Sequence, residues 1–184
     1  MDFSNEQRLI VTLLTEIHAK LGIEDGLDPN FVQEMVSSGH TWALNWKYPG
    51  LFSGPVETPH NVKRVADVLD MWDVIERTVS SLSPAEKSEV ERLTSPAHVS
   101  SARFSGYSGN TEDEYSIVHV LVERLGKWSS FSGRDFDAHM PMVDVYDRML
   151  DAYQIVNPIS AYSPTLSVES LVEVLNARTH PDNR

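Results

Sequence analysis

The chain contains no cysteine among its 184 residues. This excludes disulfide-stapled scaffolds, zinc modules with thiolate ligands and hydrolases with a thiol nucleophile. Long hydrophobic runs are also missing, since none approaches the roughly 20 apolar residues of a membrane-spanning helix. The opening residues, MDFSNEQRLI, carry early acids and no basic region, so they do not predict a secretory signal. We therefore expect a cytoplasmic protein with no membrane partner.

Basic residues are scarce. There are 15 Lys and Arg against 27 Asp and Glu, which gives a formal net charge of -12. Both halves of the chain are negative, so the acidity is not confined to a tail. Such a surface repels phosphate backbones and lacks the basic stripe that nucleic-acid binding needs, so we expect no DNA or RNA partner.

Motifs of nucleotide and acyl chemistry are missing as well. The sequence has no Gly-x-Ser-x-Gly elbow, no Walker A loop and no dinucleotide fingerprint. The Gly-containing run at residues 105–109 lacks the lysine and the preceding strand that a phosphate cradle requires. The sequence thus favours a non-enzymatic protein, and we expect no cofactor and no catalytic residue.

Helix signals are plentiful. Ser4 and Gln7 form a capping box, and an apolar face with three- to four-residue spacing follows it until Gly22. This face consists of Leu9, Ile10, Leu13, Leu14, Ile17 and Leu21. Further start signals are Asp28-Pro29, Thr58-Pro59, Ser83-Pro84-Ala85-Glu86, the predicted capping box Thr111-Glu112-Asp113-Glu114, Pro141 and Ser167.

Strand alternation is almost absent, so the sequence predicts an all-α fold, a globular bundle of about seven to eight helices. At this length we expect a single domain over residues 1–184. Within it, an N-terminal helical group at about 1–57 is predicted to pack on a C-terminal group at about 58–184.

Residues 103–153 are the most informative segment, because they hold eight of the 16 Phe, Trp and Tyr residues. Aromatic, glycine and proline positions here and in the preceding long helix carry a family resemblance. They are Asp67, Met71-Trp72, Phe104, Gly106-Tyr107, Thr111-Glu112, Tyr115, Gly126, Phe131, Phe136, Pro141-Met142, Tyr146 and Arg148-Met149-Leu150.

In this pattern the chain resembles the bacterial YfbU family, an uncharacterised family. The opening run from Asn5 to Ile10 and the cap at Ser167 fit as well, whereas residues 26–59 and 94–101 depart from the family pattern. The resemblance implies a soluble, helical bacterial protein. It supplies no catalytic residues, and the association of one member with stress-induced cell death implies a regulatory role.

The aromatic loops are the first candidate site. Phe104, Tyr107, Phe131 and Phe136 can line a pocket for a small molecule, with Arg103 or Arg134 binding an anion and His139 beside them. The alternative is that the aromatic rings only hold two helices together, since aromatic side chains mainly supply buried area.

A metal site is a weaker alternative. Asp135, Asp137 and His139 alternate in one loop, while His119 and Glu123 lie one turn apart on a helix. Together they offer nitrogen and oxygen ligands for a divalent metal. Ordinary turn-capping and i,i+4 pairing explain the same residues, and we expect no metal.

A third candidate is an interaction surface. Trp42, Trp46, Tyr48 and Phe52 cluster in a short segment, and Trp and Tyr are frequent anchors of protein interfaces. The alternative is that they pack on the N-terminal helices.

Two functions stay open from the sequence. The first is a non-enzymatic regulatory or protein-interaction role in a homo-oligomer. The second is a small-molecule or metal-binding protein, hydrolytic in one version, whose site lies between the 104–110 and 131–139 loops.

Overall fold

The computed structural model describes residues 3–52, 54, 57–94 and 102–180. It confirms the all-α prediction, with eight α-helices and three short helical turns in this part of the chain. In chain order they are α1 (Asn5–Leu21), α2 (Pro29–Ser38), α3 (Trp42–Lys47), α4 (His60–Ser81), α5 (Pro84–Leu93), α7 (Glu114–His119), the π-helical turn η1 (Val120–Arg124), the 3₁₀ turn η2 (Ser129–Phe131), α8 (Val143–Val156), the 3₁₀ turn η3 (Ile159–Ala161) and α9 (Val168–Asn176).

Most helix ends follow local sequence signals. In α1 the Ser4 hydroxyl accepts from Gln7 N at 3.2 Å, and Gln7 Oε1 accepts from Ser4 N at 2.9 Å. Gly22 then closes α1 with a φ of 62°, a left-handed conformation that favours glycine. A second capping box starts α5 at Ser83, and the Asp28 and Ser167 side chains cap α2 and α9. These predictions are confirmed.

The predicted capping box at residues 111–114 is wrong. The N-terminus of α7 has no side-chain cap. Glu112 instead accepts from Ser108 N and from Met142 N and Val143 N, each at 2.7 Å. The spacing matched a local motif, but the start of α8 lies within reach of the same carboxylate. Glu112 therefore joins the 104–110 loop to the N-terminus of α8, and α8 begins at Val143 rather than at Pro141.

The core is one continuous cluster built around α4, the longest helix. The buried side of α4 carries nine residues, and α7 and α8 pack against that helix while α9 packs against α5 and α8. The same cluster reaches into α2 and α3 through Phe31, Met35 and Trp42. A salt bridge between Glu34 of α2 and Arg124 of η1 adds a second link between the N-terminal helices and the rest.

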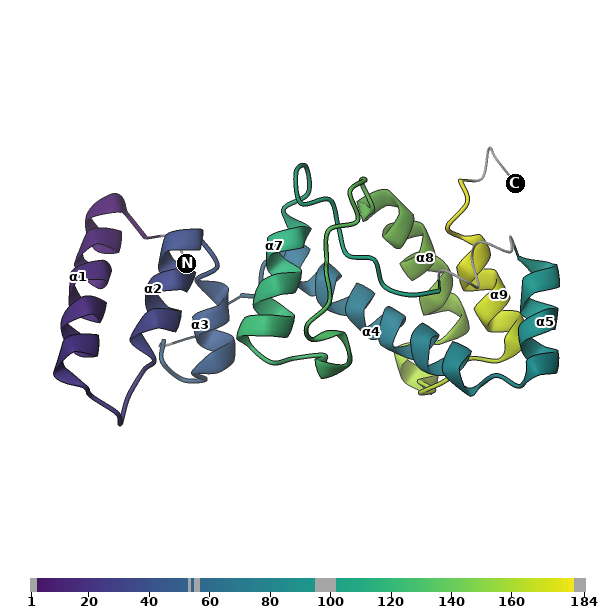
Figure 1. The fold of residues 1–184 in the computed structure, drawn as a ribbon, viewed down its shortest axis with the longest axis horizontal. Helices are drawn as coiled ribbons and strands as arrows, with labels where there is room; N and C mark the ends of the chain where they lie inside the picture. Colours follow the sequence, from purple (N-terminus) through teal and green to yellow (C-terminus); the bar gives the residue numbers. More distant parts are fainter. Residues whose placement is uncertain (1–2, 53, 55–56, 95–101, 181–184) are drawn as a thin grey trace.

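The molecule is elongated, with α1 at one end and α5 and α9 at the other (Figure 1). Helix α2 lies between α1 and the rest of the chain, and it is the main packing partner of α1. Within the described residues, no helix is both long and apolar enough to cross a membrane.

Candidate functional site

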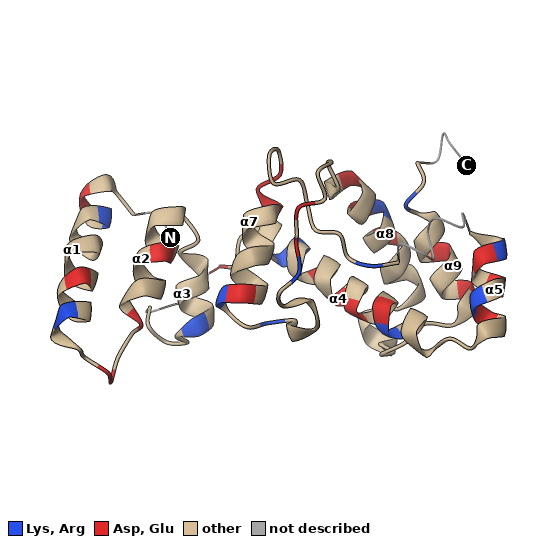
Figure 2. Cartoon of the chain, in the orientation of Figure 1, with Lys and Arg blue, Asp and Glu red and all other residues tan. Residues whose placement is uncertain are grey.

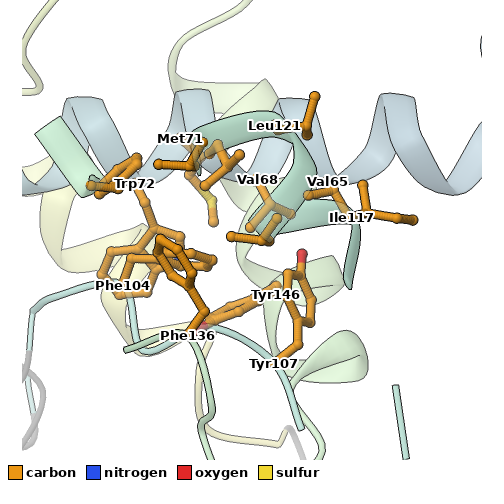
Figure 3. Packing of buried hydrophobic residues seen from close by; sticks show 14 of the residues in the cluster. Val65, Val68, Met71, Trp72, Phe104, Tyr107, Ile117, Leu121, Phe136 and Tyr146 are labelled. Carbon is orange, nitrogen blue, oxygen red and sulfur yellow. The ribbon is translucent and has the colours of Figure 1, made fainter. Parts of the chain in front are cut away.

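The four aromatic residues of the loops lie in the core. Phe104, Tyr107, Phe131 and Phe136 are each at most 2% exposed. The Phe104 ring centroid lies 5.5–6.3 Å from those of Trp72, Tyr107, Phe131, Phe136 and Tyr146. Figure 3 shows Trp72 of α4 together with Phe104, Tyr107, Phe136 and Tyr146. The rings thus contribute buried area, with one edge-to-face contact to Tyr107 and tilted contacts to the others, and their own surface is closed to solvent.

The two loops run side by side at this point. Tyr107 N donates to Phe136 O and Ala138 N donates to Tyr107 O, both at 2.9 Å. Gly106 has a φ of 83°, and a Cβ atom there would lie 1.8 Å from Phe136 O. Only glycine therefore allows the 104–110 loop to approach the 131–139 loop this closely.

Two of the polar candidates of the loops, Arg134 and His139, have protein partners. Arg134 donates from Nη1 and Nη2 to the two oxygens of Glu76, each at 2.8 Å, and its guanidinium lies 4.7 Å from the centre of the Phe131 ring. His139 is at the surface, with its side chain 77% exposed and Nδ1 3.1 Å from Asp137. Arg103 is exposed. The predicted pocket stays a prediction.

Titration shifts in the loops have structural causes. Burial raises the pKa of the Tyr107 and Tyr146 hydroxyls, so both are protonated at neutral pH. The backbone amides of Gly109 and His139 lower the pKa of Asp137 by donating to its carboxylate. All three shifts move the pKa away from neutral pH, where general acid–base catalysis works best.

The metal candidates are also engaged elsewhere. The His119 ring packs against Tyr115 and Phe136, with centroids 4.8 and 5.2 Å apart. Glu123 accepts from Gly133 N at 2.7 Å. In the part of the chain that the structure describes, no three His, Asp or Glu side chains form a group that could hold a metal ion.

The residues of the predicted Trp42–Phe52 surface are largely packed. Trp42 is buried, whereas Trp46, Tyr48 and Phe52 are half-buried. Trp46 Nε1 donates to Thr58 Oγ1 at 3.2 Å, and Asp28 N donates to the Tyr48 hydroxyl at 2.9 Å. This surface stays a prediction.

A groove between α4 and α8 was not predicted from the sequence. It has a volume of about 520 Å³, and Asp67, Asp70, Leu150 and Tyr153 are among its lining residues. Burial raises the pKa of both Asp67 and Asp70, and Asp70 accepts from Trp128 Nε1 at 2.7 Å. Three-residue spacing, as between Asp67 and Asp70 or between Leu150 and Tyr153, is common on helices, so no sequence pattern indicated that these side chains share a groove.

An exposed apolar surface follows the length of α1. Its apolar face points away from α2, and six side chains that would ordinarily be buried are 51–69% exposed. They are Leu9, Ile10, Leu13, Leu14, Ile17 and Leu21, which we call the α1 face.

The opposite side of α1 packs on α2 through smaller and more polar groups. Thr15 is the one buried residue of α1, and its hydroxyl donates to Val11 O at 2.9 Å and lies 3.3 Å from Gln33 Oε1 of α2. The side of α1 that contacts the rest of the molecule is therefore its less apolar side. The sequence predicted the apolar face, but amphipathic spacing alone does not show which side meets the neighbouring helix.

Cavities lie beside α1 where it meets α2. One of about 210 Å³ is almost wholly apolar and is lined by Val11, Leu14, Leu27, Pro29 and Val32, together with Thr15 and His18. Another, of about 460 Å³, includes Glu16, Ile17, Lys20 and Leu21 from α1 and Asn30 and Gln33 from α2. The α1 face is therefore a ridge bordered by grooves, a shape suited to a protein partner.

Among known families, the model of the YfbU domain matches residues 1–177 of the chain. The chain belongs to the YfbU family. This confirms the resemblance seen in the sequence, and the match extends over α1 as well as over both aromatic loops. In this YfbU protein the α1 face is an exposed apolar surface that lies within the residues matched to the family domain.

Proposed function

We propose that this YfbU protein is a non-enzymatic regulatory protein that acts through protein–protein contacts, and that the α1 face is its contact surface. The observation that carries the proposal is the outward position of six large apolar side chains on one helix. Contiguous exposed apolar surface of this kind is a marker of interaction sites.

The proposal includes a cytoplasmic, homo-oligomeric protein. The absence of cysteine from the sequence supports the compartment, and the exposed α1 face supports assembly. The net charge of -12 disfavours a nucleic-acid partner.

The alternative is a small-molecule or metal-binding, in one version hydrolytic, protein with a site between the 104–110 and 131–139 loops. It stays a prediction. No observation on the described residues favours it, because the loop aromatics are buried and Arg134 and His139 contact Glu76 and Asp137.

A photo-crosslinking residue placed at Leu13 tests the proposal in cells. We expect covalent adducts to protein at position 13 after irradiation. A matched variant with the same residue at Lys87, an exposed position of α5, should give none. Absence of adducts at position 13, or equal yields at both positions, would contradict an interaction role of the α1 face.

A further inference from the structure

The α1 face leaves six large apolar side chains exposed in a single copy of the chain. We propose that two copies of the chain pair through α1 in antiparallel orientation, around a two-fold axis near Leu13. The inference rests on the proposed function and names the partner of that surface. A two-fold pairing uses the same patch on both copies and closes without leaving a second patch exposed.

The area of the face fits a dimer. The six side chains, each 51–69% exposed, present on the order of 600 Å² of surface, so two copies would bury on the order of 1,200 Å², the lower end of specific interfaces. A single copy leaves this area in water, although burial of apolar surface is the main driving force of association. The area is therefore compatible with a specific dimer.

The charges of α1 favour antiparallel pairing. The helix carries two acids, Glu6 and Glu16, and two bases, Arg8 and Lys20, so its formal charge is zero in a chain of -12. Both signs are visible along α1 in Figure 2. Glu6 and Lys20 are exposed, and they lie equally far from Leu13 along the helix.

An antiparallel partner therefore places Glu6 of each copy beside Lys20 of the other. A parallel partner would place Glu6 beside Glu6 and Lys20 beside Lys20, and like charges at such positions are destabilising. Antiparallel helices also place the positive N-terminus of one helix beside the negative C-terminus of the other. The charges therefore favour the antiparallel orientation, which the apolar side chains alone do not distinguish from the parallel one.

The position of α1 leaves room for a second copy. It lies at one end of the elongated molecule, and the remaining helices extend to the other side of α2 (Figure 1). The apolar cavity beside Leu14, formed with Leu27 and Val32, offers space for a side chain of the partner at the edge of the pair. Two copies can therefore meet along α1 while their bodies point away from each other.

A lipid surface fits the face less well. Helices that lie on membranes carry many Lys and Arg residues on their polar side. In α1 only Arg8 and Lys20 are basic, two acids accompany them, and the whole chain would be repelled by anionic lipid.

Disulfide trapping in purified protein tests the pairing, because the cysteine-free chain is a clean background. Leu13→Cys should form a covalent dimer under mild oxidation, and Lys87→Cys should not. Ile10→Cys and Ile17→Cys, one of them carrying a size tag, should cross-link preferentially with each other when mixed. Preferential cross-linking of Ile10→Cys with itself and of Ile17→Cys with itself would overturn the antiparallel orientation.

Charge reversal provides the second test, with the dimer dissociation constant measured by sedimentation. Glu6→Lys and Lys20→Glu each turn two attractive contacts into two repulsive ones, so each should weaken the dimer by about tenfold. The double variant should return to within about threefold of the wild type, because reversed pairs attract again. Lys87→Glu is the matched control and should change nothing.

Failure of the inference is distinguishable from failure of the proposed function. A wild-type chain that stays monomeric at every concentration, with position-13 photo-adducts to other proteins, would overturn self-pairing and leave the interaction role intact. A monomer that binds anionic vesicles in an α1-dependent way, without protein adducts, would overturn both.

Discussion

Two carboxylates, those of Glu76 and Glu112, hold the 104–110 and 131–139 loops and the start of α8 in place. Glu76 of α4 accepts from Phe104 N at 2.8 Å and from both terminal nitrogens of Arg134. Glu112 accepts from three backbone amides of the 104–110 loop and of the start of α8. Backbone amides without a partner in a protein interior are costly, so these side chains replace the regular pairing that the loops lack.

Glu76→Ala should lower the free energy of unfolding by about 2 kcal/mol. It removes the acceptor of the Phe104 amide and the charged partner of Arg134, which keeps only Ser130 O, and the Arg134 and Glu76 side chains are only 17–21% exposed. The matched control is Glu89→Ala, whose ion pair with Arg92 is exposed, and its effect should stay below about 0.5 kcal/mol. Chemical denaturation measures both. Equal losses in the two variants would contradict the role assigned to Glu76.

His40 provides a prediction on pH. Burial lowers its pKa, although the charges of Asp113 and Glu34 act in the opposite direction. The unfolded chain, with an ordinary pKa of about 6.5, therefore binds the proton more readily than the folded chain. Stability contributed by neutral His40 is present above that value and is lost as pH falls below it, until the lowered pKa of the folded state is reached.

The unfolding midpoint in denaturant, measured at pH 7.5 and at pH 5.5, tests this assignment. His40→Asn removes the titrating group, so its midpoint should fall less between the two pH values than that of the wild type. The same decrease in both proteins would show that His40 does not contribute.

Among the helices, α1 and α4 show that the same apolar spacing can produce a buried face in one helix and an exposed face in another. Both helices carry apolar residues at three- to four-residue spacing. The apolar side of α4 forms the centre of the core, and Leu69 is fully buried there. The apolar side of α1 faces outward, and Leu13 is 51% exposed. Tertiary packing, not amphipathicity, decides which of the two faces belongs to the core.

The variants Leu69→Ala and Leu13→Ala distinguish a buried apolar position from an exposed one. Leu69→Ala opens a cavity and should lower the free energy of unfolding by about 2–5 kcal/mol. Leu13→Ala should change it by less than about 0.5 kcal/mol when the protein is dilute enough to be monomeric. Thermal or chemical unfolding followed by circular dichroism measures both, and a large loss for Leu13→Ala in the monomer would place that side chain in a core.

The predictable part of this fold is the part that local chemistry decides. Ser4, Asp28, Ser83 and Ser167 cap helices as predicted, because a cap needs only residues within one turn. Glu112 has a similar local pattern, yet the N-terminus of α8, 30 residues further along the chain, binds its carboxylate. No local pattern reports such a contact.

Further features could not be predicted from the sequence, because they depend on contacts between residues far apart in the chain. The helix after residue 114 widens into a π-helical turn at η1, where Leu125 N donates to Val120 O, and no residue pattern announced it. The loop aromatics were predicted to line a pocket or to pack, and composition alone could not decide between these. Likewise the α1 face was visible as a pattern, but its exposure depends on how α2 is placed.

At the scale of the whole molecule, charge and apolar surface are distributed differently. Acidic residues occur along the entire chain, while most of the exposed large apolar side chains lie in or next to α1 at one end. Copies of a protein with a net charge of -12 repel one another at a distance. Because the acids and bases of α1 cancel, two copies repel each other least when they approach through this end.

The α1 face is proposed to pair two copies of the chain. Sedimentation velocity over a concentration series measures this pairing, with wild type, the double variant Leu13→Glu/Ile17→Glu and the control Lys87→Glu. We predict a dimer for the wild type and the control, and a folded monomer for the double variant, because two buried carboxylates per copy should weaken pairing by at least about 100-fold. A wild-type monomer throughout, or a dimer that the double substitution leaves unchanged, would contradict the claim.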